Sequence, residues 1–335
     1  MTLLKGSRAL IFAVGGGGDV ASAGYLKNIL DGYYKEIYLC CIPWERSVYD
    51  PTPGPIKYDE VYNARMGDGY AIVNGGSYAI RNGRKIYFQA VKLSRVLNEE
   101  VFIVSPIYGL DSMVYGLENI LKEYGIDVLI SLDVGGDILS TGYEDGLWSP
   151  LSDSFGLAST YILYEKGFTA YIAVSSIGAD GELDKEYLLE RISRIAGEGG
   201  LLRVIGYGSL DLSYMDKILG YVDTEASSIA YKAVKGFKGR IPIRGGSRTV
   251  DIDVTSILIF FLDPALVYKY STPAKIVRRI KSFEEVNMEF IRNGIPTEYE
   301  FERILYDLRK NKVDKNNLYE KAREILLNKL KKFKS

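Results

Sequence analysis

The segment 8–24, with the sequence RALIFAVGGGGDVASAG, places the strongest constraint on the fold of this chain. It begins with an apolar, β-rich run that has the length of a buried strand, and four glycines follow directly. From Asp19 onward apolar residues recur at helical spacing, and Asp19 stands at the expected N-cap. A strand, a glycine loop and a helix in this order are typical of the opening unit of a doubly wound α/β domain.

Predicted strands and helices continue to alternate after this unit. Further strand-like runs lie at 35–42, 100–105, 127–132 and 168–174, with helical patterns at 88–97, 111–124, 150–165 and 182–196. This alternation predicts an α/β fold with a mostly parallel, Rossmann-like sheet and helices on both faces. The rhythm changes after residue 200, although residues 257–262 still read as a core strand.

We predict a single Rossmann-like α/β domain over residues 1–268 and a helical C-terminal appendage over residues 269–335. Residues 47–83 are rich in Pro, Gly, Asn and Tyr, which favours a lid-like insertion. The appendage holds 17 Lys and Arg against 10 Asp and Glu, whereas the first 268 residues hold 25 against 33 and carry a net charge of −8. We interpret the basic tail as the solvated face of amphipathic helices, with nucleic-acid binding as the weaker alternative.

The composition excludes several classes of active site. The chain has no histidine, which rules out His-dependent catalytic triads and His-ligated zinc. The only cysteines, Cys40 and Cys41, are adjacent and expected on opposite faces of a strand, so a disulfide framework is excluded. Proton transfer must therefore use Asp, Glu, Lys, Tyr or water, and a bound metal would be a hard cation on oxygen ligands.

No apolar run approaches the roughly 20 residues that a membrane-spanning helix needs, and no signal peptide precedes the first strand. We therefore expect a cytoplasmic protein without a membrane partner. A homo-oligomer is compatible with the sequence.

The glycine loop has an internal counterpart. Residues 17–24, GGDVASAG, align without gaps to residues 135–142, GGDILSTG, and each segment follows a hydrophobic strand. In an open parallel sheet the loops after the strands lie along the carboxyl edge, where ligands bind. The repeat therefore predicts two loops that face one crevice.

Both loops offer backbone groups to a ligand. Glycines allow N–H groups to approach an anion closely, and the N-terminus of a helix favours negative charge. The predicted ligand-binding residues are Gly15, Gly16, Gly17, Gly18, Asp19, Gly135, Gly136 and Arg248. Arg248 follows Gly245 and Gly246 and offers a guanidinium fork to a phosphate or carboxylate.

Four aspartates are predicted to converge on the crevice. Clustered carboxylates repel one another unless a cation joins them or one of them holds a proton, and either outcome is functional. We interpret Asp133, Asp137 and Asp153 as candidate catalytic groups, and Asp19, Asp133 and Asp137 as candidate ligands of Mg²⁺. The alternative is that Asp19, Asp137 and Asp153 only cap helices.

Residues 16–21 also fit the pattern G-x-G-x-x-A of dinucleotide-binding loops. A run of four glycines satisfies that spacing almost automatically, and Glu45 lies 27 residues after Gly18, farther than the usual distance of about 20. Asp19 would also crowd a pyrophosphate unless a cation intervened. An NAD(P)- or FAD-dependent oxidoreductase therefore stands as the alternative function.

Three motifs together resemble an uncharacterised, largely archaeal family classed as a domain of unknown function. They are the strand followed by GGGGDVASA, the later DVGGD, and SPLSDSFGLA. The resemblance covers most of the first 265 residues, and the tail after Thr272 lies outside it. It implies an α/β, nucleotide-binding-like fold and a cytoplasmic setting, without an activity or catalytic residues.

These observations predict an enzyme that acts on a phosphorylated or nucleotide-like small molecule. We expect a hydrolase or group transferase that uses carboxylates, with Mg²⁺ as the candidate cofactor. A non-enzymatic ligand-binding or sensor protein is the third class that the sequence allows.

Overall fold

A computed structural model describes residues 6–311 and 318–334 of the chain. Within these residues, nine strands form one sheet in the order β11-β14-β10-β9-β1-β2-β8-β5-β4. The five inner strands are parallel: β10 (Thr169–Ser175), β9 (Val128–Val134), β1 (Arg8–Ala13), β2 (Glu36–Cys41) and β8 (Val101–Ile103). The α/β fold with a mostly parallel sheet is confirmed.

The order of the parallel strands changes direction at β1. The chain moves outward from β1 through β2 and β8, and then returns to add β9 and β10 on the other side of β1. β1 and β9 are hydrogen-bonded neighbours. In open α/β sheets, ligands bind outside the carboxyl ends of the strands at such a switch point. The loops after β1 and β9 therefore lie where a ligand is expected.

Both edges of the sheet contain antiparallel pairs. β14 (Leu258–Leu262) pairs antiparallel with β10 and with β11 (Leu201–Gly206). At the other edge, β5 (Ala71–Val73) pairs antiparallel with β8 and with β4 (Arg65–Met66). The apolar run at 257–262 predicted a core strand, and β14 is that strand. Its antiparallel direction could not be predicted, because an apolar run does not indicate how a buried strand is oriented in the sheet.

Residues 47–83 contribute to two sheets. β4 and β5 extend the central sheet, whereas β3 (Val61–Tyr62) and β6 (Tyr78–Arg81) join β7 (Arg84–Ile86) in a separate sheet. The buried guanidinium of Arg81 holds this region together, since it donates to Asp50 and to the carbonyl oxygen of Gly54 at 2.9 Å. Its role as a lid stays a prediction.

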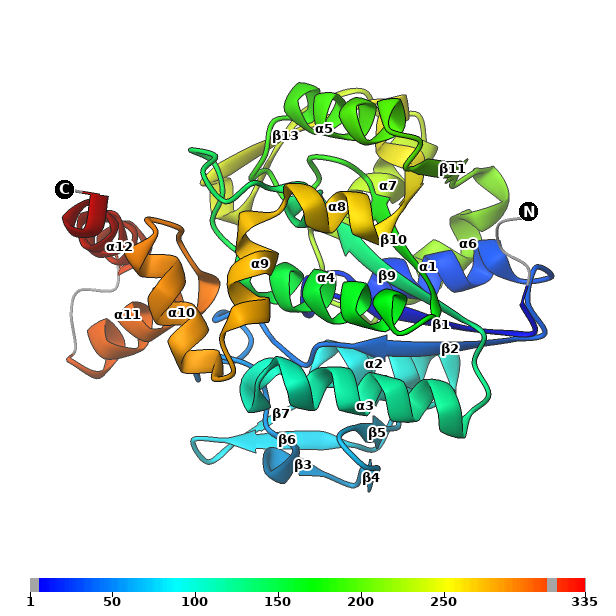
Figure 1. The fold of residues 1–335 in the computed structure, drawn as a ribbon, viewed down its shortest axis with the longest axis horizontal. Helices are drawn as coiled ribbons and strands as arrows, with labels where there is room; N and C mark the ends of the chain where they lie inside the picture. Colours follow the sequence, from blue (N-terminus) through cyan, green and yellow to red (C-terminus); the bar gives the residue numbers. More distant parts are fainter. Residues whose placement is uncertain (1–5, 312–317, 335) are drawn as a thin grey trace.

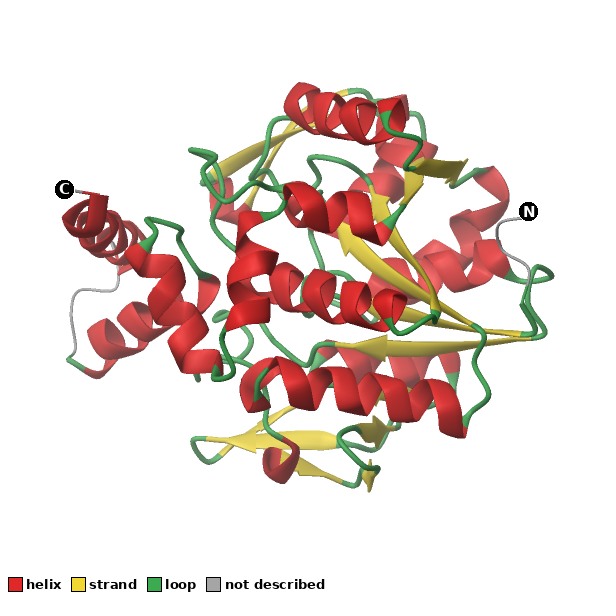
Figure 2. Ribbon diagram, in the orientation of Figure 1, coloured by secondary structure: helices red, strands yellow, loops and turns green. Residues whose placement is uncertain are grey.

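Helices cover both faces of the central sheet (Figures 1 and 2). One face packs against α3 (Leu110–Glu123), α4 (Pro150–Glu165), α5 (Lys185–Gly197), α8 (Pro264–Tyr270) and α9 (Thr272–Arg279). The other face packs against α1 (Val20–Leu30), α2 (Gln89–Leu97), α6 (Leu212–Leu219) and α7 (Ala226–Val234). Alternating side chains divide each strand between two apolar cores. Cys40 and Cys41 lie in opposite cores as buried free thiols, as predicted.

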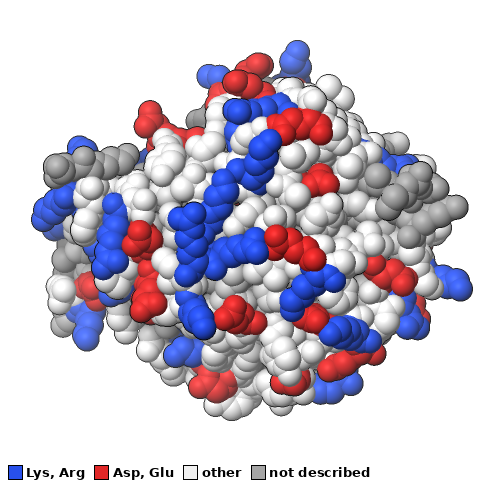
Figure 3. Space-filling model, viewed as in Figure 1, with Lys and Arg blue, Asp and Glu red and all other residues white. Residues whose placement is uncertain are grey.

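Three C-terminal helices and one hairpin complete the fold, and Phe283, Val286 and Phe290 belong to the same apolar core as α4. The helices α10 (Phe283–Arg292), α11 (Glu298–Lys310) and α12 (Leu318–Lys334) gather at one end of the molecule (Figure 1). β12 (Gly239–Ile243) and β13 (Arg248–Ile252) form a hairpin. On the face drawn in Figure 3, basic and acidic side chains are interspersed. None of the helices described is long and apolar enough to cross a membrane. The separate C-terminal appendage stays a prediction.

Candidate functional site

The glycine loop after β1 folds around the carboxylate of Asp19. The N–H of Gly15 donates to Asp19 Oδ2 at 2.7 Å. A Cβ atom at Gly15 would lie 2.4 Å from the same oxygen, so this position requires glycine. Asp19 stands at the N-cap position of α1, but its side chain makes no capping hydrogen bond. The loop therefore holds the carboxylate at the edge of the sheet.

A second glycine of this loop also has a partner. The N–H of Gly17 donates to the carbonyl oxygen of Trp44 at 2.8 Å. The carbonyl oxygen of Gly18 accepts from Ser227 Oγ at 2.8 Å and from Thr224 Oγ1 at 3.2 Å. Two of the predicted anion donors, Gly15 and Gly17, are thus engaged within the protein. The loop therefore positions the Asp19 carboxylate, and its Gly15 and Gly17 N–H groups are not available to bind an anion.

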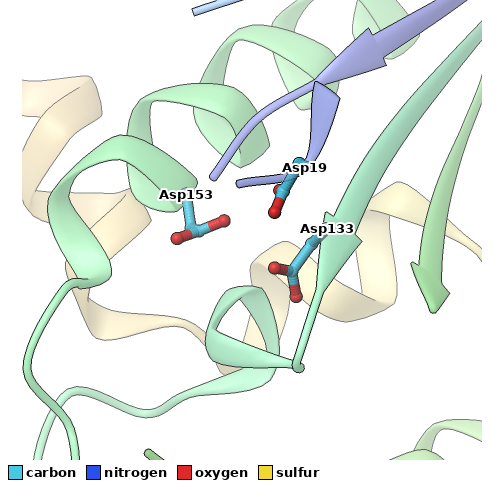
Figure 4. A group of neighbouring side chains, drawn as sticks. All are labelled: Asp19, Asp133 and Asp153. Carbon is cyan, nitrogen blue, oxygen red and sulfur yellow. The ribbon is translucent and has the colours of Figure 1, made fainter. Parts of the chain in front are cut away.

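Asp133 and Asp153 point toward Asp19, as Figure 4 shows. Asp133 comes from the end of β9 and Asp153 from the first turn of α4. Each of the three side chains offers one carboxylate oxygen, and these oxygens lie within 4.8 Å of one another. All three side chains are buried. We name Asp19, Asp133 and Asp153 the first triad.

The start of α4 is held tightly against the end of β1, which places Asp153. Ser152 Oγ donates to the carbonyl oxygen of Val14 at 2.6 Å, and a Cβ atom at Gly156 would lie 2.4 Å from Val14 Cβ. Glu298 of α11 accepts the N–H groups of Leu151 and Ser152 at 3.1 and 2.7 Å. These N–H groups have no partner within the helix, so Glu298 caps α4 from a distant part of the chain.

A second group of three acids adjoins the first. It consists of Asp137, Asp180 and Glu182, whose carboxylate oxygens also lie within 4.8 Å of one another. We name it the second triad. The loops that carry it follow β9 and β10 and bind each other, since the N–H of Gly135 donates to Ser175 O at 3.1 Å and that of Gly178 to Gly135 O at 2.6 Å.

Arg248 lies against the second triad. Its Nη1 atom donates to Glu182 Oε1 at 2.8 Å and to the carbonyl oxygen of Asp180 at 3.1 Å. Glu182 Oε2 also accepts the N–H groups of Trp148 and Ser149 at 2.6 and 2.9 Å. Burial acts to raise the pKa of Glu182, but Arg248 and these hydrogen bonds hold it below the usual value. Arg248, predicted to bind a ligand anion, is thus paired with a protein carboxylate.

The first triad has no such counter-charge. Burial raises the pKa of Asp133 to about 7, and repulsion by Asp180 adds to the effect. Burial and repulsion from Asp133 also raise the pKa of Asp19 and of Asp153 well above the usual range. Across residues 6–311 and 318–334, no Lys or Arg forms an ion pair with any member of this triad.

One carboxylate oxygen in each triad lacks a hydrogen-bond partner. They are Oδ1 of Asp153 and Oδ1 of Asp137, and these side chains are only 3% and 4% exposed. A buried polar atom left unsatisfied is costly, and a native structure keeps few of them. A hard divalent cation binds carboxylate oxygens and also relieves their repulsion. The donor set therefore fits Mg²⁺, Mn²⁺ or Ca²⁺.

The model of a family described as "Protein of unknown function (DUF1152)" matches residues 10–306. The chain belongs to this family. The matched range runs past residue 272, where the sequence resemblance was expected to end, and it includes both triads and Arg248. No curated protein matches the chain. Membership in the DUF1152 family thus confirms the resemblance without assigning an activity.

Within this DUF1152 chain, the structure places most of the predicted residues at one edge of the sheet. It groups Asp153, rather than Asp137, with Asp19 and Asp133. Asp137 lies in the second triad and in a single 3-10 turn, Asp137–Leu139, so it caps no α-helix. Gly135 and Gly136 have φ angles of +121° and +118°, and a Cβ atom at Gly135 would lie 2.5 Å from the Asp180 carboxyl group.

Three site residues were missed by the sequence analysis. The predicted helix began at residue 182, whereas α5 begins at Lys185 behind the N-cap Asp184, which leaves Asp180 and Glu182 in a buried loop. The signal for them was positional, because the loop after a third parallel strand must reach the same edge of the sheet. Glu298 reaches the site across 147 positions, which no local pattern reveals.

Glu45 follows β2, where a dinucleotide-binding fold carries the acid for its ribose. Here Glu45 is buried and accepts the N–H of Gln89 at 2.9 Å, at the start of α2, and Gln89 Nε2 at 3.2 Å. Burial raises its pKa to about 7, although these hydrogen bonds oppose the change. A Cβ atom at Gly17 would lie 2.8 Å from Glu45 Oε1. Glu45 therefore joins the glycine loop to α2.

Proposed function

We propose that this protein is a metal-dependent hydrolase or group transferase acting on a phosphorylated or nucleotide-like small molecule. The first triad, Asp19, Asp133 and Asp153, would hold a divalent cation such as Mg²⁺. One observation carries the proposal: three buried carboxylates converge without a basic partner, and one of their oxygens is unpaired. Such a cluster is stable when a cation joins it.

The residues suit phosphoryl chemistry. A bound divalent cation polarises a phosphoryl oxygen and lowers the pKa of bound water. Burial and its acidic neighbours raise the pKa of Asp137, and acids perturbed in this way are candidates for general acid–base catalysis. In hydrolysis, water adds to phosphorus, the bond to the leaving oxygen breaks, and a carboxylate passes the proton lost by water to that oxygen.

The strand order supports a nucleotide-like ligand. The parallel strands β8-β2-β1-β9-β10 correspond to the order 3-2-1-4-5, which favours a doubly wound, Rossmann-like interpretation. Ligands of such folds place phosphate groups near the N-terminus of the first helix, here α1. The two triads lie at that same end of the sheet.

The dinucleotide-dependent oxidoreductase is less well supported. Glu45 is engaged by Gln89, and the N–H groups of Gly15 and Gly17 already have partners inside the protein. The acid that follows the glycines, Asp19, is aimed at two other carboxylates, as a cation ligand would be.

Cation binding is the direct test. We expect Mg²⁺ and Mn²⁺ to raise the melting temperature, and a panel of nucleotides and phosphate esters to raise it further in their presence, because ligands that bind only the folded state stabilise it. Product release from the panel then separates an enzyme from a sensor.

The matched variants are Asp19→Asn, in the first triad, and Asp307→Asn, an exposed acid on α11. Calorimetric titration with Mn²⁺ should show weaker binding only for Asp19→Asn. Equal affinities in the two variants, or no binding by the unmodified protein, would show that the proposal is wrong.

A further inference from the structure

Arg244, at the turn between β12 and β13, carries a guanidinium without a hydrogen-bond or ion-pair partner among residues 6–311 and 318–334. Its Nε atom is buried and makes no hydrogen bond. Among the residues described, no carboxylate forms an ion pair with its side chain. Burial lowers the pKa of this guanidinium, and the nearby charges of Arg46 and Arg248 add to the effect. Arg244 is therefore a partly buried cation beside two other arginines, and the charges of Glu182 and Asp180 act on it in the opposite direction.

The backbone of Arg244 is also unusual. Its φ angle is +55°, in the left-handed region that side chains with a Cβ atom rarely adopt. Gly245 and Gly246 follow with φ angles of +66° and +89°, which cost a glycine nothing. Strained residues of this kind cluster at ligand clamps and active sites. The turn thus holds an arginine where a third glycine would be easier to accommodate.

Glu225 explains how the arginines are arranged. Its Oε1 atom accepts the backbone N–H of Arg244 at 2.9 Å, and its Oε2 atom accepts Arg46 Nη1 at 2.9 Å. Glu225 therefore fixes the backbone of Arg244 and the side chain of Arg46, but leaves the Arg244 side chain free. The side chain of Arg248, by contrast, is already hydrogen-bonded to Glu182.

We propose that Arg244, supported by Arg46, binds the phosphoryl group of the ligand beside the second triad. The guanidinium fork matches two oxygens of a phosphoryl group, and a multiply charged anion would relieve the repulsion among the three arginines. The inference rests on the proposed function and deepens it, because it places the anionic part of the ligand at the second triad, whose Asp180 lies near Asp133 of the triad that would hold the cation. It transfers the predicted anion-binding role from Arg248 to Arg244.

Calorimetric titration of the full chain with pyrophosphate tests this inference, with and without Mn²⁺. The unmodified protein should bind pyrophosphate, and Arg244→Gln should bind it at least about tenfold more weakly, as expected for hydrogen bonds between charged groups. The matched control is Arg240→Gln on the same hairpin, whose exposed side chain pairs with Asp251. This control should retain the affinity within about twofold, as expected for an exposed pair.

Arg244→Lys keeps the positive charge but loses the fork, so a folded Arg244→Lys protein with weakened binding supports the inference even if Arg244→Gln does not fold. Equal pyrophosphate affinity in Arg244→Gln and the unmodified protein overturns it, as does tighter binding of malonate than of pyrophosphate. If Arg244→Gln loses pyrophosphate binding but the unmodified protein does not bind Mn²⁺, the anion site is supported and the proposed function is wrong. If the protein binds Mn²⁺ but Arg244→Gln does not change pyrophosphate binding, the proposed function is supported and the anion site at Arg244 is wrong.

Discussion

The two acidic triads lie at the same edge of one sheet but are neutralised in different ways. In the second triad, Arg248 and two backbone N–H groups engage Glu182, and the pKa of Glu182 lies below its usual value. In the first triad, no basic side chain among the described residues offsets the charge, and the pKa of each carboxyl group is raised, with burial as the main cause.

The difference shows that burial alone does not decide the charge state of these acids. Both triads are buried, and burial acts to raise every pKa in them. What separates Glu182 from the other acids is a counter-charge supplied by the chain itself, since the pKa of Asp137 and that of Asp180 in the same triad are still raised. The protein provides that charge for Glu182, through a hairpin remote in sequence, but not for Asp19, Asp133 and Asp153. A cluster of buried acids without a counter-charge is a signature of a functional site.

Arg248→Gln should have the largest effect, because it converts the second triad into an unbalanced one. Glu182 is 1% exposed and Arg248 19% exposed in this pair, and removing one partner of a buried ion pair costs about 3 kcal/mol or more. Denaturant unfolding measures the loss. Arg240→Gln, in an exposed pair on the same hairpin, should change stability little. Mn²⁺ should recover part of the stability of Arg248→Gln, and an equal loss in both variants would refute the comparison.

Asp133→Asn should have the next largest effect, on the first triad. The variant removes one of three proposed ligands, so we expect the Mn²⁺ affinity to fall by about 100-fold, or roughly 2.7 kcal/mol. In EDTA the same variant should melt at a higher temperature than the unmodified protein, since one of three repelling acids is gone. Asp307→Asn is the control. A lower melting temperature in EDTA with unchanged Mn²⁺ binding would contradict the unbalanced state of the triad.

Much of the fold follows from local sequence patterns. The strands β1, β2, β8, β9, β10 and β14 lie within or close to the predicted runs, and α4 spans Pro150–Glu165 as predicted. These elements are set by apolar periodicity, which a single sequence displays. The antiparallel pairs at the two edges were not predicted in detail, because pairing partners and strand direction depend on tertiary contacts.

The candidate site was only partly predictable. Asp19 and Asp133 could be associated because each follows a strand and glycines mark both loops. The balance of charge could not be predicted, because Arg248 reaches Glu182 across 66 positions and Glu298 caps α4 from the C-terminal helices. Such contacts depend on packing of whole elements, whereas the acids themselves are placed by the sheet.

The pH dependence of stability should distinguish Asp133 from Glu182. Asp133 keeps its proton in the folded protein to about pH 7, whereas an unfolded aspartate loses it near pH 3.9. The folded state therefore binds more protons between these values, and stability in EDTA should fall as pH rises, by about 1.4 kcal/mol per pH unit for each extra proton. Glu182, with its lowered pKa, contributes the opposite slope only at acidic pH.

Denaturant unfolding in EDTA at pH 5, 6, 7 and 8 measures this dependence. The stability of Asp133→Asn should fall less steeply with pH than that of the unmodified protein. Part of the fall should remain, because burial also raises the pKa of Glu45 and of Glu298 to about 7. Saturating Mn²⁺ binds the ionised acids, so its stabilising effect should grow with pH. If stability changed with pH equally in Asp133→Asn and in the unmodified protein, Asp133 would not be an acid with a raised pKa, and its place in the unbalanced triad would be wrong.

Arg244→Gly should have the smallest effect on stability. It tests the difference between Arg244, which has no carboxylate partner among the described residues, and Arg248, which pairs with Glu182. The left-handed backbone of Arg244 costs about 1 to 2 kcal/mol for a residue with a Cβ atom, and the extra freedom of glycine in the unfolded chain offsets about 0.5 to 1 kcal/mol of the gain. We therefore expect Arg244→Gly to be about 0.5 kcal/mol more stable than the unmodified protein. Removing a partly buried cation that lies beside Arg46 and Arg248 acts in the same direction.

The same variant should lose pyrophosphate binding, so stability and binding would move in opposite directions. That pattern separates a residue kept for a ligand from one kept for the fold, because a structural arginine would lower stability when removed. Arg248→Gln provides the contrast, since Arg248 balances Glu182 and its loss should destabilise the protein. If Arg244→Gly were as destabilising as Arg248→Gln, Arg244 would belong with the internal counter-charges of the second triad, and the protein would have no free guanidinium beside its acids among the arginines compared.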